Sequence, residues 1–175
     1  MARMTTWTAP ETTRPTGSFT ADEFTMLRSD LAWHRATLLH KCAGLTGEQL
    51  AQRTVPPSNL SLLGLIRHMA KVERIWFREK FAGQQLPPMY DVAKGKDADF
   101  EDLDPTRAEE DYARLLEEMR QADEIASNAR LDDTFLLNGE KASLRFIYLH
   151  LIGEYARHNG HADLIRERLD GTTGG

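Results

Sequence analysis

Side chains that could bind a metal or transfer protons lie in two distant apolar segments of this chain. Glu154, His158 and His161 fall within one short stretch, and His68 lies far upstream. Glu154 and His158 are four residues apart, so on a helix they share a face, which also carries Leu151 and should be buried. Buried charge is costly unless it is paired or coordinates a metal. One carboxylate with histidines from two helices is a ligand set for a divalent metal with an open coordination position.

A metal at this position would lower the pKa of a bound water or thiol, or would polarise a carbonyl group. His161 lies further around the helix and could be a third ligand, a partner of a ligand, or a catalytic base. A structural explanation is also open: His68 could be a hydrogen-bonded core residue, and Glu154 could pair with Arg157 at the surface. His158 and His161 could then belong to a small polar network, and spacing alone does not decide between these explanations.

The elements that must position these residues are helical. Apolar periodicity predicts four long helices, over residues 21–43, 62–82, 105–128 and 142–169. Ser61 and Ser143 are the expected caps of the second and fourth helices, and Gly83 and Gly171 their expected stops. No strand pattern is long enough to build a sheet.

The segment between the second and third helices, residues 84–104, is rich in acids and contains two adjacent prolines. Its lack of periodicity predicts a long loop, of the kind that is often a functional lid or simply mobile. Four amphipathic helices with a long middle connection predict an all-α four-helix bundle over residues 19–171. Residues 1–18 are expected to form a flexible arm, and residues 172–175 a loose tail.

Composition narrows the function classes. The net charge of −5 argues against nucleic-acid binding through a basic surface. No apolar stretch approaches the ~20 residues that span a bilayer, and the first eighteen residues lack the apolar centre of a signal peptide. One cysteine, Cys42, excludes an internal disulfide, fits a reducing cytoplasmic compartment, and is expected to be a buried structural thiol.

Several charged residues on the second helix are expected to be solvated. They are Arg67, Glu73, Arg74 and Arg78. A substrate carboxylate is the alternative partner for Arg67.

Two stretches carry a resemblance to a known family. Residues 62–77 read LLGLIRHMAKVERIWF, and residues 143–167 read SLRFIYLHLIGEYARHNGHADLIRE. Here the chain resembles the DinB/YfiT-like superfamily of small four-helix metalloproteins, and is closest to its actinobacterial branch, the mini-circle proteins. It is also similar to the metal-binding domain of mycothiol-dependent maleylpyruvate isomerases.

The resemblance implies a metal site made by His68, Glu154 and His158. Most of the superfamily has a histidine where this chain has Glu154, but the similar isomerases use a His/Glu/His set. His161 falls where many members have glutamine. Zinc is the first expectation, while nickel, manganese and iron fit the same ligands.

The implied function is that of a metal-dependent S-transferase or isomerase that activates a low-molecular-weight thiol, of the mycothiol or bacillithiol type. The thiolate would attack a small electrophilic substrate, and His161 would move protons as the catalytic residue. The alternatives are a hydrolase that activates water, a non-enzymatic metal-binding stress or interaction module, and a helical dimerisation module. Related proteins imply a homodimer, to which Trp7 or Phe19 could contribute.

Overall fold

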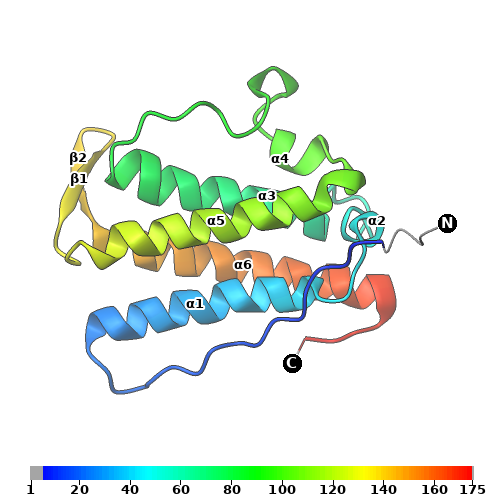
Figure 1. The fold of residues 1–175 in the computed structure, drawn as a ribbon, viewed down its shortest axis with the longest axis horizontal. Coiled ribbons are helices and arrows are strands. Elements are labelled where there is room, and N and C mark those ends of the chain that lie inside the picture. The colour runs from blue at the N-terminus through cyan, green and yellow to red at the C-terminus, as the bar shows by residue number, and fades with distance from the viewer. Residues whose placement is uncertain (1–5, 175) are drawn as a thin grey trace.

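The structure is a computed structural model that describes residues 6–174 of the chain. Its four longest helices lie alongside one another (Figure 1). They are α1 (Glu23–Cys42), α3 (Leu62–Glu73), α5 (Ala108–Ser127) and α6 (Leu144–Asp170). α1 packs on α6, and α3 packs on both α5 and α6. The mostly helical architecture expected from the sequence is confirmed.

The helices α3 and α5 follow each other in the chain and run in the same direction (Figure 1). The connection between them therefore has to travel back along the molecule before α5 can begin. It contains the 3₁₀ turn η2 (Val92–Lys94), the short helix α4 (Ala98–Glu101) and the 3₁₀ turn η3 (Pro105–Arg107). The short helix α2 (Gly47–Leu50) packs against η3 and also contacts α3 and α5.

One apolar core holds the long helices together. Each contributes fully buried side chains, for example Leu38 from α1, Leu65 from α3, Leu115 from α5 and Leu151 from α6. Burial of one such leucine stabilises the fold by about 2 kcal/mol. This core fixes the faces of α3 and α6 that turn inward, and with them the residues that lie between the leucines.

The expected helix limits agree with the structure at several ends. The side chain of Ser61 accepts a hydrogen bond from Gly64 N, and that of Ser143 accepts one from Phe146 N. Gly171 ends α6 with a φ of 80°, a conformation that glycine adopts without steric cost. The second helix differs, because α3 continues from Arg74 to Phe81 as the π-helix η1.

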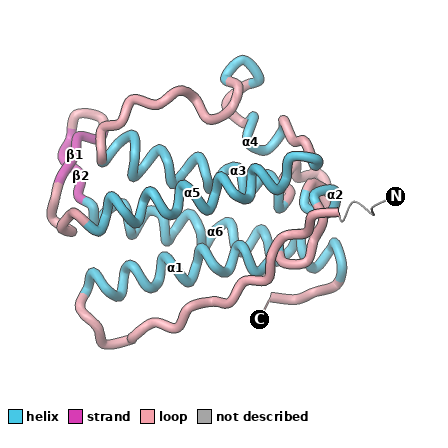
Figure 2. The backbone as a smooth tube through the Cα atoms, viewed as in Figure 1, coloured by secondary structure: helices cyan, strands magenta, loops and turns pink. Residues whose placement is uncertain are grey.

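The absence of a sheet was a wrong expectation. Strands β1 (Thr134–Leu137) and β2 (Glu140–Ser143) form an antiparallel hairpin in which Phe135 pairs with Ala142 (Figure 2). Asn138 and Gly139 connect them with φ values of 53° and 87°. These values suit the type I′ turn that an Asn-Gly pair favours.

Two charged residues of α3 that were expected in solvent are buried. Glu73 is 0% exposed and receives two hydrogen bonds from Arg35 of α1, while Arg67 is 8% exposed. Arg74 and Arg78 are half-buried. α3 is packed by neighbours on several sides, and these supply carboxylate and carbonyl partners that its own sequence does not reveal. Cys42 is buried, as expected.

The chain ends pack unevenly. Residues 1–5 of the expected arm and residue 175 of the expected tail lie outside the described residues. Ala9 is buried and exchanges backbone hydrogen bonds with the segment after α1, and the Trp7 ring meets Tyr112 edge-on. Phe19, in contrast, is 98% exposed. Within residues 6–174, no helix is both long enough and apolar enough to cross a bilayer.

Candidate metal centre

Three side chains from two helices converge between α3 and α6. His68 comes from α3, and Glu154 and His158 come from successive turns of α6. One ligand atom of each lies within 4.8 Å of those of the other two. Oε2 of Glu154 lies 3.9 Å from Nε2 of His68 and 3.6 Å from Nε2 of His158. The structure therefore brings together the residues that the sequence singled out.

The spacing of these atoms suits a shared ion better than mutual hydrogen bonds. Both nitrogen-to-oxygen distances exceed the roughly 3.2 Å limit of a good N–H···O bond. Arg157 Nη1 is 3.8 Å from Glu154 Oε1, and its side chain is 68% exposed, so it forms no tight pair with that carboxylate. The explanation in which these groups only satisfy one another is thus weakened. Two imidazoles and a carboxylate are a donor set that fits a divalent metal.

The environment of His158 favours its neutral form, which is the form that binds metals. Its side chain is buried. Burial lowers the pKa of His158 to about 4, and the nearby His68 acts in the same direction, although the charge of Glu154 opposes them. Near neutral pH the imidazole is therefore uncharged and carries a free lone pair.

Each of the two histidines has a partner on its other ring nitrogen. Nδ1 of His68 is 2.8 Å from Oδ2 of Asp99 in α4, and Nδ1 of His158 is 3.2 Å from Nδ1 of His161. In both cases Nε2 is the atom that faces Glu154. His161 thus lies behind a candidate ligand, rather than among the three converging atoms.

Asp99 was not singled out from the sequence. Burial by itself raises the pKa of its carboxyl, but the hydrogen bond from His68 and the charge of Lys71 outweigh that effect, so the pKa lies below its ordinary value. Phe100, the next residue, stacks on the His68 ring with a centroid distance of 4.7 Å. The acidic connection contains many such residues without periodicity, so no sequence signal separates Asp99 from the others.

The other histidines of the core helices lie outside this cluster. His150 contacts Trp76 and Phe146, and the backbone and ring of His34 contact Asn159. A cavity of about 400 Å³ lies between α3, η1 and the connection, and Lys71 and Asp99 line it. The connection therefore borders both the candidate metal site and a space that could admit a small molecule.

Comparison with known proteins places the chain in a family. The family model described as mycothiol S-transferase matches residues 26–171, a range that includes all three converging residues. A search of curated proteins found no match. The chain belongs to the mycothiol S-transferase family, within the DinB/YfiT-like superfamily of metalloenzymes.

Proposed function

We propose that this protein is a metal-dependent S-transferase or isomerase that joins a low-molecular-weight thiol, mycothiol or a relative such as bacillithiol, to a small electrophile. The observation that carries the proposal is the convergence of His68, Glu154 and His158, with ligand atoms that meet without hydrogen-bonding one another. Membership of the mycothiol S-transferase family supports the choice of thiol.

The three residues would hold one divalent cation, with zinc as the first choice and nickel, manganese or iron as alternatives. Three protein ligands leave a position for an outside molecule. Such a cation lowers the pKa of a thiol that binds it and so supplies a thiolate nucleophile near neutral pH. The remaining tasks, which are binding, orientation and proton handling, fall to the chain's own side chains.

The chain cannot supply the thiolate from its own cysteine. Cys42 is the one cysteine in the sequence and is 0% exposed, and burial raises the pKa of its thiol to about 12. A thiol nucleophile must therefore come from a separate molecule. We assign proton transfer to His161, whose Nδ1 lies 3.2 Å from Nδ1 of His158.

The proposal includes finer points of architecture and location. We infer a four-helix bundle made by α1, α3, α5 and α6, and a cytoplasmic enzyme in which a reducing environment keeps the thiol substrate reduced. We also propose a homodimer. Phe19, Met26 and Trp33 support it, because these exposed apolar side chains line one hollow beside α1. Measurement of molecular mass in solution tests this point.

The decisive experiment measures turnover of monochlorobimane with mycothiol, bacillithiol and other thiols. The metal-loaded wild type is expected to conjugate the electrophile only when a thiol is present, and His158→Ala is expected to lose both metal and turnover. His150→Ala is the matched control, because His150 lies on the same helix outside the cluster and should retain both. Absence of thiol-dependent turnover by protein with a full metal content would refute the proposal.

The same assay separates the alternatives. Turnover of an ester or amide substrate without any thiol would indicate a hydrolase. Absence of metal from carefully purified wild type, with His68→Ala as the control for adventitious binding, would indicate a structural or interaction module.

A further inference from the structure

Asp99 is an acidic residue in an unusual setting. Its side chain is almost fully buried, although it comes from a helix of only four residues in a long connection. Oδ2 lies 2.8 Å from Nδ1 of His68 and 3.3 Å from Nζ of Lys71. Oδ1 is buried, and no described residue gives it a hydrogen bond. A buried carboxylate oxygen without a hydrogen bond destabilises the fold, so the burial of Asp99 calls for an explanation.

The chemistry of the contact fixes the proton on His68. An ionised carboxylate only accepts hydrogen bonds, so Nδ1 of His68 must be the donor. A neutral imidazole with its proton on Nδ1 has its lone pair on Nε2, the nitrogen that faces Glu154 at 3.9 Å. Histidines that bind metals commonly donate their second ring nitrogen to a carboxylate, which orients the ring and makes it a stronger ligand.

We infer that Asp99 is a positioning residue of the candidate metal centre: it holds the proton of His68 on Nδ1, and so leaves Nε2 free to bind the ion. This inference rests on the proposed metal site. It assigns a task in that site to the connection between α3 and α5, which carries none of the three ligands.

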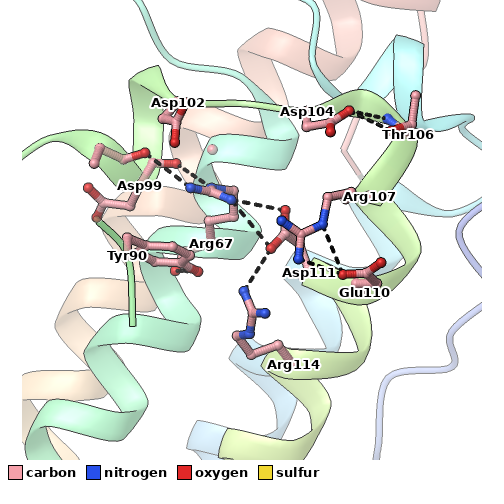
Figure 3. Close-up of polar contacts among 12 residues, drawn as sticks. Arg67, Tyr90, Asp99, Asp102, Asp104, Thr106, Arg107, Glu110, Asp111 and Arg114 are labelled. Carbon is pink, nitrogen blue, oxygen red and sulfur yellow. Dashed lines mark hydrogen bonds and ion pairs between the residues drawn. The ribbon is translucent and has the colours of Figure 1, made fainter. Parts of the chain in front are cut away.

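Arg67 fixes α4, and through it Asp99, in place (Figure 3). Its Nε donates to the carbonyl oxygen of Asp99 at 3.0 Å, and its Nη2 donates to that of Ala98 at 3.1 Å. Nη1 meets Asp111 of α5 at 3.2 Å, and the guanidinium lies 4.1 Å from the ring centre of Tyr90. α4 has no side-chain cap of its own, so these contacts replace the stability that a single helical turn lacks.

Arg67 and His68 are neighbours in sequence and contact the same residue of α4. Arg67 binds the Asp99 backbone, and His68 binds the Asp99 side chain. The position of the carboxylate is therefore set relative to the same turn of α3 that presents the ligand. This geometry allows little freedom for the His68 ring to rotate.

The first test observes the proton directly in metal-free protein. Nitrogen-15 NMR of the imidazole at a pH where His68 is neutral is expected to find Nδ1 protonated in the wild type. In Asp99→Ala the proton is expected to shift toward Nε2, whereas Asp102→Ala, at the end of the same short helix, should leave it on Nδ1. A wild-type proton on Nε2, or an unchanged tautomer in Asp99→Ala, would overturn the inference.

The second test measures zinc affinity of the metal-free protein. Loss of such a carboxylate partner is expected to weaken binding about 10- to 100-fold in Asp99→Ala. Asp99→Asn retains an acceptor oxygen and should recover part of that loss, and Asp102→Ala should bind as the wild type does. Wild-type affinity in an Asp99→Ala protein whose circular dichroism shows a native fold would contradict the assignment.

These results are separable from failure of the proposed function. If metal-loaded wild type lacks thiol-dependent turnover, the function fails, while the affinity series still decides the role of Asp99. If the wild type binds none of zinc, nickel, manganese and iron, the proposed function and this inference both fail.

Discussion

Replacement of Glu73 by alanine is expected to destabilise the protein by about 4 kcal/mol. Glu73 is fully buried, accepts two hydrogen bonds from Arg35 at 2.6 and 2.7 Å, and accepts a third from the hydroxyl of Tyr155 at 2.8 Å. Removal of one partner from a buried ion pair costs about 3–5 kcal/mol, because the other charge stays buried without compensation. Asp123 still binds Nη1 of Arg35 at 2.7 Å, which places this part of the cost near about 3 kcal/mol. The unpaired hydroxyl of Tyr155 adds about 1 kcal/mol.

Urea unfolding followed by circular dichroism measures this effect. With a slope of about 2 kcal/mol per molar urea, the midpoint is expected to fall by about 2 M without a change of slope. Glu117→Ala is the control, because Glu117 pairs with Arg120 on the exposed face of α5, where loss of an ion pair has little effect on stability. The double replacement of Arg35 and Glu73 by methionine should recover much of the loss, since it removes both charges. A cost for Glu73→Ala no larger than that for Glu117→Ala would refute this reasoning.

Three further outcomes follow from the structure. Cys42 should resist a thiol reagent in native protein at pH 8 and react only on unfolding, and Cys42→Ser should keep thiol-dependent turnover. Fast labelling of the native wild type, or loss of turnover in a folded Cys42→Ser variant, would contradict an inert role for this cysteine. Metal-free protein should lose about 1 kcal/mol of unfolding free energy for each unit by which the pH falls from 6.5 to about 4, because His158 binds a proton in the unfolded chain but not in the folded one. If the unfolding free energy of His158→Gln depends on pH as steeply as that of the wild type, this cause is excluded. Gly47→Ala should destabilise by roughly 2 kcal/mol or more, because its new Cβ would clash with the Pro105 carbonyl oxygen, whereas Gly153→Ala on the open side of α6 should stabilise by up to about 1 kcal/mol. Equal thermal midpoints for the two variants would contradict this expectation.

The long helices, and the approach of His68 to Glu154 and His158, were predictable because both depend on local periodicity. The apolar stripe of α6 places Glu154 and His158 on one inward face, and that of α3 places His68 on another. The two faces meet in the core, as the helical pattern predicts. The hairpin was missed, although the sequence holds an Asn-Gly pair, the strongest short turn signal for two adjacent strands.

The buried polar partners could not be read in the same way. His68 meets Asp99 thirty-one residues away, and Arg35 meets Glu73 thirty-eight residues away. The residues next to these groups give no sign of such pairings, because the partners are chosen by how the helices pack. Arg67 and Glu73 therefore resemble ordinary solvated helix charges until α4, α5 and α1 are placed around α3. The π-helical continuation of α3 likewise has no signal in composition.

Because α3 and α5 run in the same direction, a long returning segment joins them, and this segment lies between the candidate ligands in the sequence. His68 precedes the returning segment, and Glu154 and His158 follow it. A protease cut in that segment would leave two fragments, neither of which retains all three donors. Any cation at the centre would then be a cross-link between the fragments, so cleaved protein should separate more readily once a chelator removes the ion.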